Sequence, residues 1–398
     1  MANIDFIFLI IFGFILLIVM LIHKKRVKVM KFLFPLFYLV MYRTKLGIPS
    51  MDKYARKHPR FFQIFSFIGI VLGFIGMAIV FYGLLISSLR ILAKPLVAEA
   101  GATLLLPGIQ IPGLPQLSFF HWIITIFVLV VVHEFSHGVI ARLYDVEIKS
   151  SGFAIFGVLL PIIPAAFVEP DEKKLAKKSY RAQLSVFAAG SFANFITAGI
   201  FFLIFLFLMV PIFDNIYEEK GVIITGLQDD YPLKNAGATI GELITNVNDI
   251  EIKSSNDVIK TLGFVKPGDS VFIKTNRTEY NIIAAQNPED SLRGYLGLSF
   301  SPLRAIKEEV RDKYGVASIK TFLWVHLLVF WIYFINFMIG LVNLLPIIIT
   351  DGSKMLYLAL LSLFKNEKRS KLFWVIINYT AIFLLLVNFL PNIIKLVT

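Results

Sequence analysis

The sequence predicts a multi-span α-helical membrane protein, of about six transmembrane helices, with a small α+β soluble domain inserted between the fourth and fifth spans. The 398-residue chain is 57% hydrophobic and only 17% charged. This composition excludes an ordinary soluble globular protein, and a chain this apolar does not stay solvated as a disordered coil. The apolar residues also form long runs, and a polar stretch of about eighty residues interrupts them.

Six runs are long and apolar enough to cross a bilayer core of about 30 Å at ~1.5 Å per residue. The first run precedes its flanking positive charges, unlike a cleavable signal peptide, so we expect it to stay in the protein as a span. The six predicted spans are Phe6–Ile22, Phe61–Ile86, Phe119–Leu143, Leu184–Ile212, Thr321–Pro346 and Leu372–Ile394.

The net charge of +12 comes from basic residues that flank the apolar runs. This pattern is typical of loops that orient membrane spans, and it does not indicate nucleic-acid binding. The loop after the first span is strongly basic, whereas the connection from Ile91 to Ser118 carries one lysine. We therefore expect the first loop to be cytoplasmic, and both termini and the polar insert to be extracytoplasmic.

Two apolar segments do not fit a simple span. Lys31–Tyr42 is too short to cross and contains Pro35, so we expect it to lie in the interface or to dip back into the membrane. Gly152–Val168 is interrupted by glycine and two prolines and is rich in Phe, Ile and Val. It predicts a short extended hairpin, embedded in the membrane as a loop that lines a water-filled cavity.

The polar insert from about Glu218 to Ser301 alternates strand-like and helix-like stretches and has the length of one small α+β domain. Together with the spans it divides the chain into four predicted segments. These are 1–118 with two spans, 119–217 as the first part of the membrane core, 218–302 as the insert, and 303–398 as the second part of the core.

The segment His133-Glu134-Phe135-Ser136-His137 is an H-E-x-x-H near the end of the third predicted span. Positions i and i+4 of a helix share one face, so both imidazoles can reach one metal ion while Glu134 acts on a water molecule. The alternative is that the three side chains satisfy polar groups inside a helical bundle. Ionisable groups are costly in lipid, which favours a functional site.

Two histidines leave a catalytic zinc site one protein ligand short. The chain has no cysteine, so the third ligand is a histidine, carboxylate or amide. Asp145 and Glu147 stand at or beyond the helix end, where solvated charges are expected, and Glu169 is a further nearby candidate. Asp351 is the better candidate, because it follows the fifth span at the predicted depth of the two histidines. The alternative for Asp351 is an exposed cap of the following helix.

With these motifs the sequence resembles the site-2 proteases, a family of intramembrane zinc metalloproteases. That family pairs H-E-x-x-H with a later N-x-x-P-x-x-x-x-D-G, and here the second motif runs from Asn343 to Gly352. A third family element, Gly-Pro-x-x-Asn, has Ser191 in place of the proline between Gly190 and Asn194. The resemblance covers roughly Phe119 to Gly352.

The resemblance implies one Zn²⁺ per chain, held by His133, His137 and Asp351, with Glu134 as the general base. Asn343 and Asn194 then stabilise the oxyanion or hold the substrate backbone, or alternatively form hydrogen bonds between helices. The implied activity is hydrolysis of peptide bonds within or near transmembrane segments of single-span membrane proteins. The active site is expected near the cytoplasmic side, and the Gly152–Val168 hairpin is expected to offer a strand edge to the unwound substrate.

The insert resembles a PDZ domain through Gly221–Ile224, Asn235–Ala238 and Lys266–Asp269. A free strand edge beside a helix would bind a peptide, or the C-terminus of a protein, as an added strand. The alternative is a folded spacer with an occluded groove. Two other functions compete with the protease for the whole protein: a divalent-cation transporter that uses the same ligands, and a silent scaffold that captures peptides through the insert.

Overall fold

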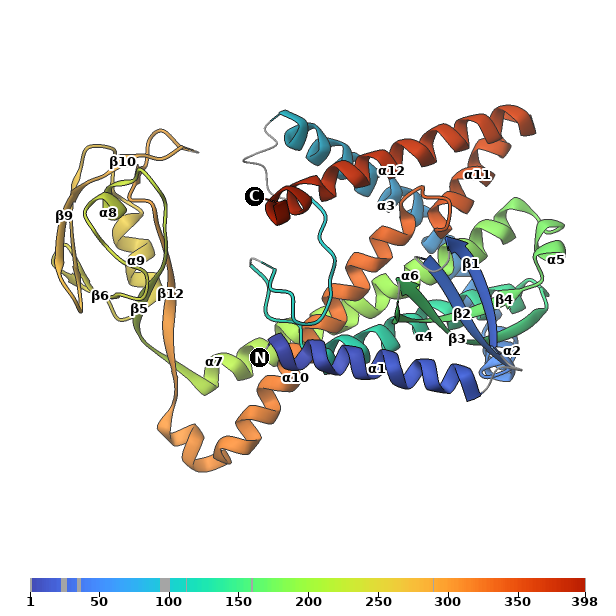
Figure 1. Cartoon of the computed structure of the whole chain (residues 1–398), viewed down its shortest axis with the longest axis horizontal. Helices are drawn as coiled ribbons and strands as arrows, with labels where there is room; N and C mark the ends of the chain where they lie inside the picture. The colour runs from blue at the N-terminus through green and yellow to red at the C-terminus, as the bar shows by residue number, and fades with distance from the viewer. Residues whose placement is uncertain are drawn as a thin grey trace. The chain divides into compact units, whose positions relative to one another are not determined.

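The computed structural model describes residues 2–22, 27–33, 37–93, 101–111, 113–158, 160–288 and 290–397 (Figure 1). The protein divides into two compact units, each of which is described by itself. The first unit is Met1–Phe205 with Val325–Thr398, and the second is Leu206–Trp324.

The first unit is mainly helical, and a sheet formed by four strands packs with its helices. Its helices are α1 (Ala2–Ile22), α2 (Ile48–Lys57), α3 (Pro59–Ala93), α4 (Phe119–Leu143), α5 (Glu172–Ala176), α6 (Tyr180–Ile204), α11 (Asp351–Phe364) and α12 (Glu367–Val397). Helix α10 (Glu308–Leu344) begins in the second unit and ends in the first. A π-helical turn, η2 (Phe205–Met209), and α7 (Val210–Ile216) follow α6 in the chain, and α7 belongs to the second unit.

Five helices among the described residues are long and apolar enough to cross a membrane. They are Pro59–Ala93, Phe119–Leu143, Tyr180–Ile216, Glu308–Leu344 and Glu367–Asn392, and each contains most or all of one predicted span. Helix α1 contributes a shorter apolar stretch, Ile7–Ile18. The helices therefore fit an integral membrane protein, while a sixth crossing by α1 and the orientation of the protein stay predictions.

The sheet of the first unit has the strand order β1-β2-β3-β4 and is antiparallel throughout. Its strands are β1 (Val27–Leu33), β2 (Phe37–Thr44), β3 (Ile148–Val158) and β4 (Leu160–Pro170). The hairpin predicted over Gly152–Val168 is confirmed as β3 and β4. Lys31–Tyr42 contributes to β1 and β2, and Pro35 lies outside the described residues. Because β3 is paired on both sides, β4 is the strand of this hairpin with a free edge.

Small side chains let α6 approach α4 closely. The α6 sequence Ala188-Ala189-Gly190-Ser191 is buried along its whole length, as is typical of helices that pack in membranes. On another side of α4, the Met51 side chain of α2 fills the space beside Gly138. Asp52 of α2 accepts a 2.7 Å hydrogen bond from Nη2 of Arg142 near the end of α4. These contacts fix the end of α4 that carries the two histidines.

The second unit contains a sheet in the order β12-β5-β6-β8-β9, with β7 paired to β6 and a separate β10-β11 pair. Its elements are β5 (Tyr217–Leu227), α8 (Pro232–Asn235), β6 (Leu243–Val247), β7 (Ile250–Glu251), α9 (Ser255–Leu262), β8 (Ser270–Thr275), β9 (Glu279–Ile283), β10 (Ala285–Gln286), β11 (Gly294–Tyr295) and β12 (Leu298–Ile306). Val222, Ile244 and Ile273 are among its fully buried core residues. The predicted mixture of strands and helices is confirmed, while the four segment boundaries stay a prediction.

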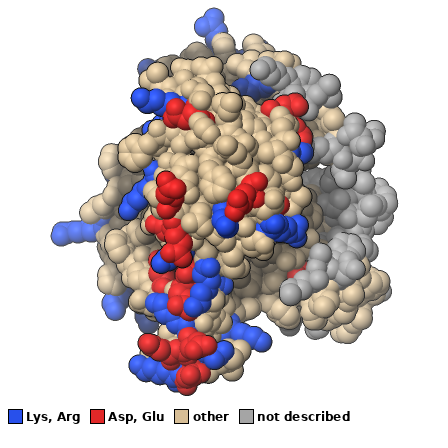
Figure 2. Space-filling view, turned by 90° about the vertical axis from the view of Figure 1, so that its left-hand side faces the viewer, with Lys and Arg blue, Asp and Glu red and all other residues tan. Residues whose placement is uncertain are grey.

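Acidic and basic side chains are interspersed on the face of the molecule in Figure 2. In the second unit several such residues form ion pairs, for example Lys274 with Glu279 at 2.7 Å and Lys253 with Glu251 at 3.0 Å. These side chains are about half exposed or more. Mixed exposed charges are typical of a surface in contact with water, and each such pair adds little to stability.

Candidate metal centre

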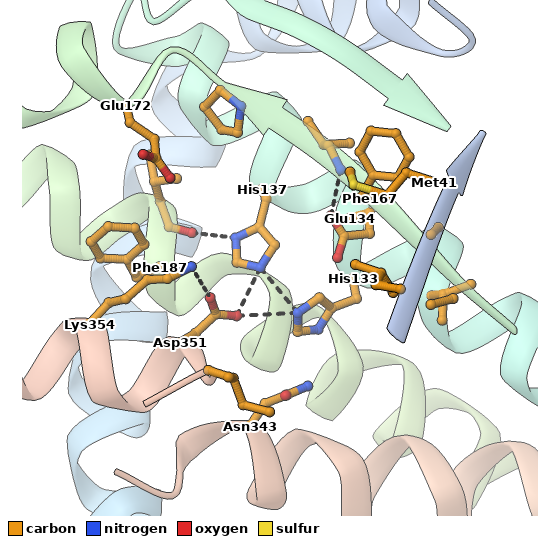
Figure 3. A pocket seen from close by; sticks show the side chains of 18 of the residues that line it. Met41, His133, Glu134, His137, Phe167, Glu172, Phe187, Asn343, Asp351 and Lys354 are labelled. Carbon is orange, nitrogen blue, oxygen red and sulfur yellow. Dashed lines mark hydrogen bonds and ion pairs between the residues drawn. The ribbon is translucent and has the colours of Figure 1, made fainter. Parts of the chain in front are cut away.

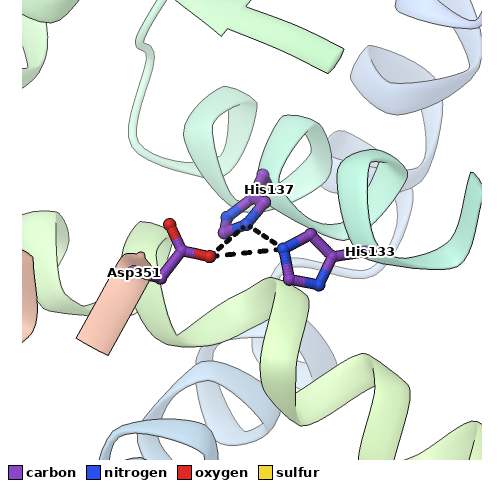
Figure 4. Close-up of side chains that lie close together, drawn as sticks. All are labelled: His133, His137 and Asp351. Carbon is purple, nitrogen blue, oxygen red and sulfur yellow. Dashed lines mark hydrogen bonds and ion pairs between the residues drawn. The ribbon is translucent and has the colours of Figure 1, made fainter. Parts of the chain in front are cut away.

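Three side chains from two helices converge in the first unit (Figures 3 and 4). Nε2 of His133 lies 3.1 Å from Nε2 of His137. Oδ2 of Asp351 lies 3.3 Å from the first of these nitrogens and 3.0 Å from the second. Ligand atoms around a tetrahedral zinc ion, with bonds of about 2.0–2.1 Å, stand roughly 3.3 Å apart. The three atoms are therefore spaced as zinc ligands are.

The backbone of α6 sets the tautomer of His137. Nδ1 of His137 lies 2.6 Å from the carbonyl oxygen of Val186. A carbonyl oxygen only accepts, so Nδ1 carries the proton, and Nε2 of the neutral ring presents a lone pair to the cluster. Such an outer hydrogen bond is the usual way in which a protein orients a metal-binding histidine.

Asn194 makes the corresponding outer hydrogen bond to His133. Its amide nitrogen stands 3.1 Å from Nδ1 of His133, and the side chain is fully buried on α6. Amide nitrogen and oxygen are assigned from the surrounding hydrogen bonds, and rotation of the amide brings Oδ1 to the same position. In that orientation Oδ1 accepts the Nδ1 proton and leaves Nε2 free for a metal.

Asp351 is aimed at the histidines by the tight junction between α10 and α11. Thr350, not Asp351, caps α11, because its side chain accepts from the Ser353 amide. A Cβ at Gly352 would lie 2.1 Å from the Leu344 carbonyl oxygen, so only glycine allows this approach of the two helices. The Asp351 side chain is 12% exposed. It is therefore not an exposed cap. Its second oxygen, Oδ1, faces the Lys354 ammonium at 3.6 Å.

Gly190 leaves room for an ion between the two imidazoles. A Cβ built at this position would lie 2.4 Å from Nε2 of His137 and 2.6 Å from Nε2 of His133. These distances are close to those of a metal ion bound to both nitrogens, which is about 2.0–2.1 Å for zinc. The donor set also fits, because two imidazoles and one carboxylate form a common catalytic zinc site.

The cluster also favours a cation on electrostatic grounds. Two neutral imidazole lone pairs and a carboxylate oxygen face one another in a largely buried site. Three acceptors this close repel each other unless a proton or a metal ion lies among them. A divalent cation satisfies all three at once.

Glu134 lies beside the cluster and contacts the free edge of β4. Its Oε2 accepts a 2.8 Å hydrogen bond from the Val168 amide. The side chain also lines a cavity of about 650 Å³ together with the three clustered residues and Asn343 (Figure 3). The cavity is bounded on one side by Ala165, Ala166, Phe167 and Val168 of β4.

A family profile matches the part of the sequence that carries this cluster. The profile of Peptidase family M50 matches residues 121–388, about two thirds of the full length. The chain belongs to peptidase family M50. This confirms the predicted resemblance to site-2 proteases at the level of the family, and by family the M50 protein is a membrane metalloprotease.

Individual proteins also resemble this M50 protein, either over most of the chain or over about a quarter of it or less. An uncharacterized protein of Methanocaldococcus jannaschii is 28% identical over 78% of this chain and 74% of that protein. A probable periplasmic serine endoprotease, DegP-like, of Brucella suis is 30% identical over 26% of this chain, and the match spans only 20% of that protein. The PDZ domain of an SdrC-like protein from Listeria monocytogenes aligns over 20% of this chain and 87% of that domain, at 23% identity and a TM-score of 0.19.

The structure brings His133, His137, Asp351, Glu134 and Asn343 of the M50 protein to one cavity. Asn194 is not among the residues that line it and instead contacts His133 from α6.

The sequence did not predict three residues that contact this site, Val186, Val168 and Lys354. The first two act through backbone groups, which leave no side-chain signal. Lys354 stands one turn after Asp351, and that spacing was a usable signal.

Proposed function

We propose that this M50 protein is an intramembrane zinc metalloprotease of the site-2 type, which cuts peptide bonds within or near the transmembrane segments of single-span membrane proteins. The observation that carries the proposal is that the ligand atoms of His133, His137 and Asp351 lie 3.0–3.3 Å apart, as zinc ligands do, beside Glu134. These residues lie on or next to helices that are apolar enough to span a bilayer. The site is proposed to face the cytoplasmic side, with the insert extracytoplasmic.

His133, His137 and Asp351 are proposed to hold one Zn²⁺ per protein molecule. A zinc ion in such a site supplies Lewis acidity, which makes water a nucleophile at neutral pH and polarises a carbonyl. Glu134 takes a proton from the attacking water and later passes it to the leaving amine. The Val168 amide holds the Glu134 carboxylate in place for both transfers.

The free edge of β4 is proposed to bind the unwound substrate as an added antiparallel strand. The Val168 amide points away from β3 toward Glu134, so the backbone groups of Ala166, two residues earlier, face the same way. Gly157 has a different role, because a Cβ there would lie 2.2 Å from the Tyr38 ring of β2. Replacing Gly157 would therefore disturb the sheet, whereas a proline at Ala166 would act on the edge itself.

The two asparagines take different proposed roles. Asn343 lines the cavity and is proposed to donate to the oxyanion or to the substrate backbone. Asn194 is proposed as a positioning residue that keeps the lone pair of His133 directed at the metal.

The insert is proposed to bind an extended peptide, or the C-terminus of a protein, as a PDZ domain does. Support comes from the second unit itself, where β12 is an edge strand of the sheet. A cavity of about 160 Å³ beside this strand and α9 is large enough for one apolar side chain. It is lined by Leu262, Val265, Gly294, Tyr295, Leu296 and Leu298.

The protease is tested with purified, zinc-loaded protein in liposomes that contain a panel of single-span substrates, beside Glu134→Gln. We expect wild type to cleave and the variant to retain zinc with a turnover ~10²–10⁴-fold lower. Equal cleavage by both proteins would contradict the proposal. Zinc flux across the liposome membrane that does not need Glu134 would favour the transporter, and peptide capture without cleavage would favour the scaffold.

A further inference from the structure

A second cavity, of about 430 Å³, adjoins the catalytic one in the first unit. It lies between α1, α4 and the β3-β4 hairpin, and every residue that lines it is apolar. These residues, which together define the apolar groove, are Phe12, Leu16, Ile123, Ile124, Ile126, Phe127, Val130, Phe153, Ala154, Ile155, Pro164 and Ala165.

The apolar groove adjoins the catalytic cavity, and the two cavities share part of their lining. Val130 and Ala165 line both cavities. Val130 stands one helical turn before His133, and Ala165 stands three residues before Val168 on the strand with the free edge. A polypeptide that leaves the groove along β4 therefore arrives at Glu134 and the metal ligands.

The groove follows α4 over the part of the helix that precedes the metal ligands. Ile123 and His133 are ten residues apart on α4, which corresponds to about 15 Å, or half of a bilayer core. Helix α1, which forms one wall of the groove, is fixed to the start of α4, where Asp5 accepts a 2.8 Å hydrogen bond from the Phe119 amide. The rings of Phe12 and Phe119 are 5.7 Å apart at the same end.

We infer that the apolar groove seats one face of the substrate's transmembrane helix, so that the helix lies along α4 and its unwound end passes onto β4. The inference rests on the proposed proteolytic function and adds the route by which substrate reaches the site. An exclusively apolar lining suits the side chains of a membrane span. The lining shared with the catalytic cavity and the position beside the free strand edge favour a polypeptide over a lipid.

Disulfide cross-linking tests the inference without requiring catalysis. The protein has no cysteine, so Phe127→Cys or Leu16→Cys supplies a single thiol in the groove of the full-length Glu134→Gln protein. Ile79→Cys on α3 and Phe383→Cys on α12 are matched controls, because these side chains are 63% and 58% exposed outside the groove. The probe is a single-span peptide of apolar residues with one cysteine placed at successive positions, in liposomes.

We expect several-fold more cross-linking at the two groove positions than at the controls, with a period of about 3.6 residues along the probe. Adding Ile124→Trp to Leu16→Cys should reduce the yield and leave the zinc content unchanged, whereas adding Ile79→Trp should change neither. Equal yields at all four thiols would overturn the inference. Yields at the control level would also overturn it if native mass spectrometry detects a bound phospholipid that Ile124→Trp displaces.

The same experiment distinguishes a failure of the groove inference from a failure of the proposed proteolytic function. If zinc-loaded wild type cleaves the probe while the groove thiols give control yields, the groove inference fails and the protease stands. If the groove thiols cross-link but wild type leaves the probe intact, the docking stands and the proposed hydrolysis fails.

Discussion

Two carboxylates with little exposure to solvent, one in each unit, differ in the partners that the protein supplies to them. Glu242 in the second unit is 1% exposed, and both of its oxygens accept hydrogen bonds. Its donors are the amide and hydroxyl of Thr239 and the hydroxyls of Thr275 and Tyr280. Asp351 in the first unit faces two imidazole nitrogens whose other nitrogens contact α6.

The difference separates a structural carboxylate from a binding site. A buried charge for which the protein supplies every donor needs nothing further and serves the fold. A buried charge that faces further acceptors is stabilised by a proton or a metal ion placed among them. The Lys354 ammonium lies 3.6 Å from the other oxygen of Asp351, outside this group of acceptors. The contrast supports the proposal that the Asp351 cluster binds an ion and that Glu242 supports the fold, and substitutions in both units test that proposal.

Asp351→Ala removes one of three proposed ligands and should abolish stoichiometric zinc binding. Two histidines alone leave the ion short of the three protein ligands that catalytic sites use. Zinc per protein molecule is measured by plasma mass spectrometry after gel filtration, with wild type as reference. Retention of one zinc per molecule by the variant would point to a different third ligand.

Gly190→Ala should weaken zinc binding by more than the ~10–100-fold loss typical of changes outside the ligand set. The added methyl would lie 2.4 Å from Nε2 of His137 and compete with the ion for its space. Gly199→Ala on the same helix is the matched control, because a Cβ there has no described atom within 4 Å apart from its chain neighbours and the nearby backbone of its own helix. Similar zinc affinities of the two variants, from competition with a chelator, would disprove the steric role of Gly190.

Asn194→Ala should lower zinc affinity by ~10–100-fold, since His133 loses the contact that orients its ring. Asn336→Ala provides the control, because Asn336 is also a fully buried asparagine and donates to the Ile332 carbonyl of its own helix. We expect Asn336→Ala to keep the wild-type zinc affinity. An equal loss in both variants would indicate a general packing effect.

Glu242→Gln should leave zinc binding unchanged and destabilise the second unit by ~1–3 kcal/mol at neutral pH. Burial acts to raise the pKa of Glu242, but the hydrogen bonds from Thr275, Thr239 and Tyr280 outweigh it and hold the pKa below its usual value. A carboxyl with a lowered folded-state pKa contributes stability above its unfolded pKa and loses it as the pH falls through the folded value.

The difference between wild type and Glu242→Gln should therefore shrink on acidification. Hydrogen exchange of peptides from β5 to β12 in the full-length protein, measured over a urea series, gives the opening free energy at each pH. A difference that stays constant down to strongly acidic pH would contradict the assigned role of Glu242.

The sequence predicted which side chains converge, because the signals that pointed to them are local. His133 and His137 share a helix face by their spacing alone, and Asp351 was singled out by its position after the fifth span, at the predicted depth of the two histidines. The extended hairpin over Gly152–Val168 was predictable from its prolines, glycine and β-branched residues. Each of these signals lies within a short stretch of sequence.

The remaining features depend on contacts between distant segments. The pairing of β2 with β3 joins Tyr38 to Gly157, and no local pattern specifies that partner. The steric role of Gly190 and the contacts of the Val186 and Val168 backbone arise only once α6 and β4 lie against α4. Tertiary packing decides these features.

X-ray absorption at the zinc edge of the purified, zinc-loaded protein examines the metal centre itself. We predict one zinc per protein molecule with nitrogen and oxygen neighbours at about 2.0–2.1 Å. The imidazole signal should fall in both His133→Ala and His137→Ala. A zinc spectrum that both substitutions leave unchanged would place the metal elsewhere and contradict the assignment of His133, His137 and Asp351 as its ligands.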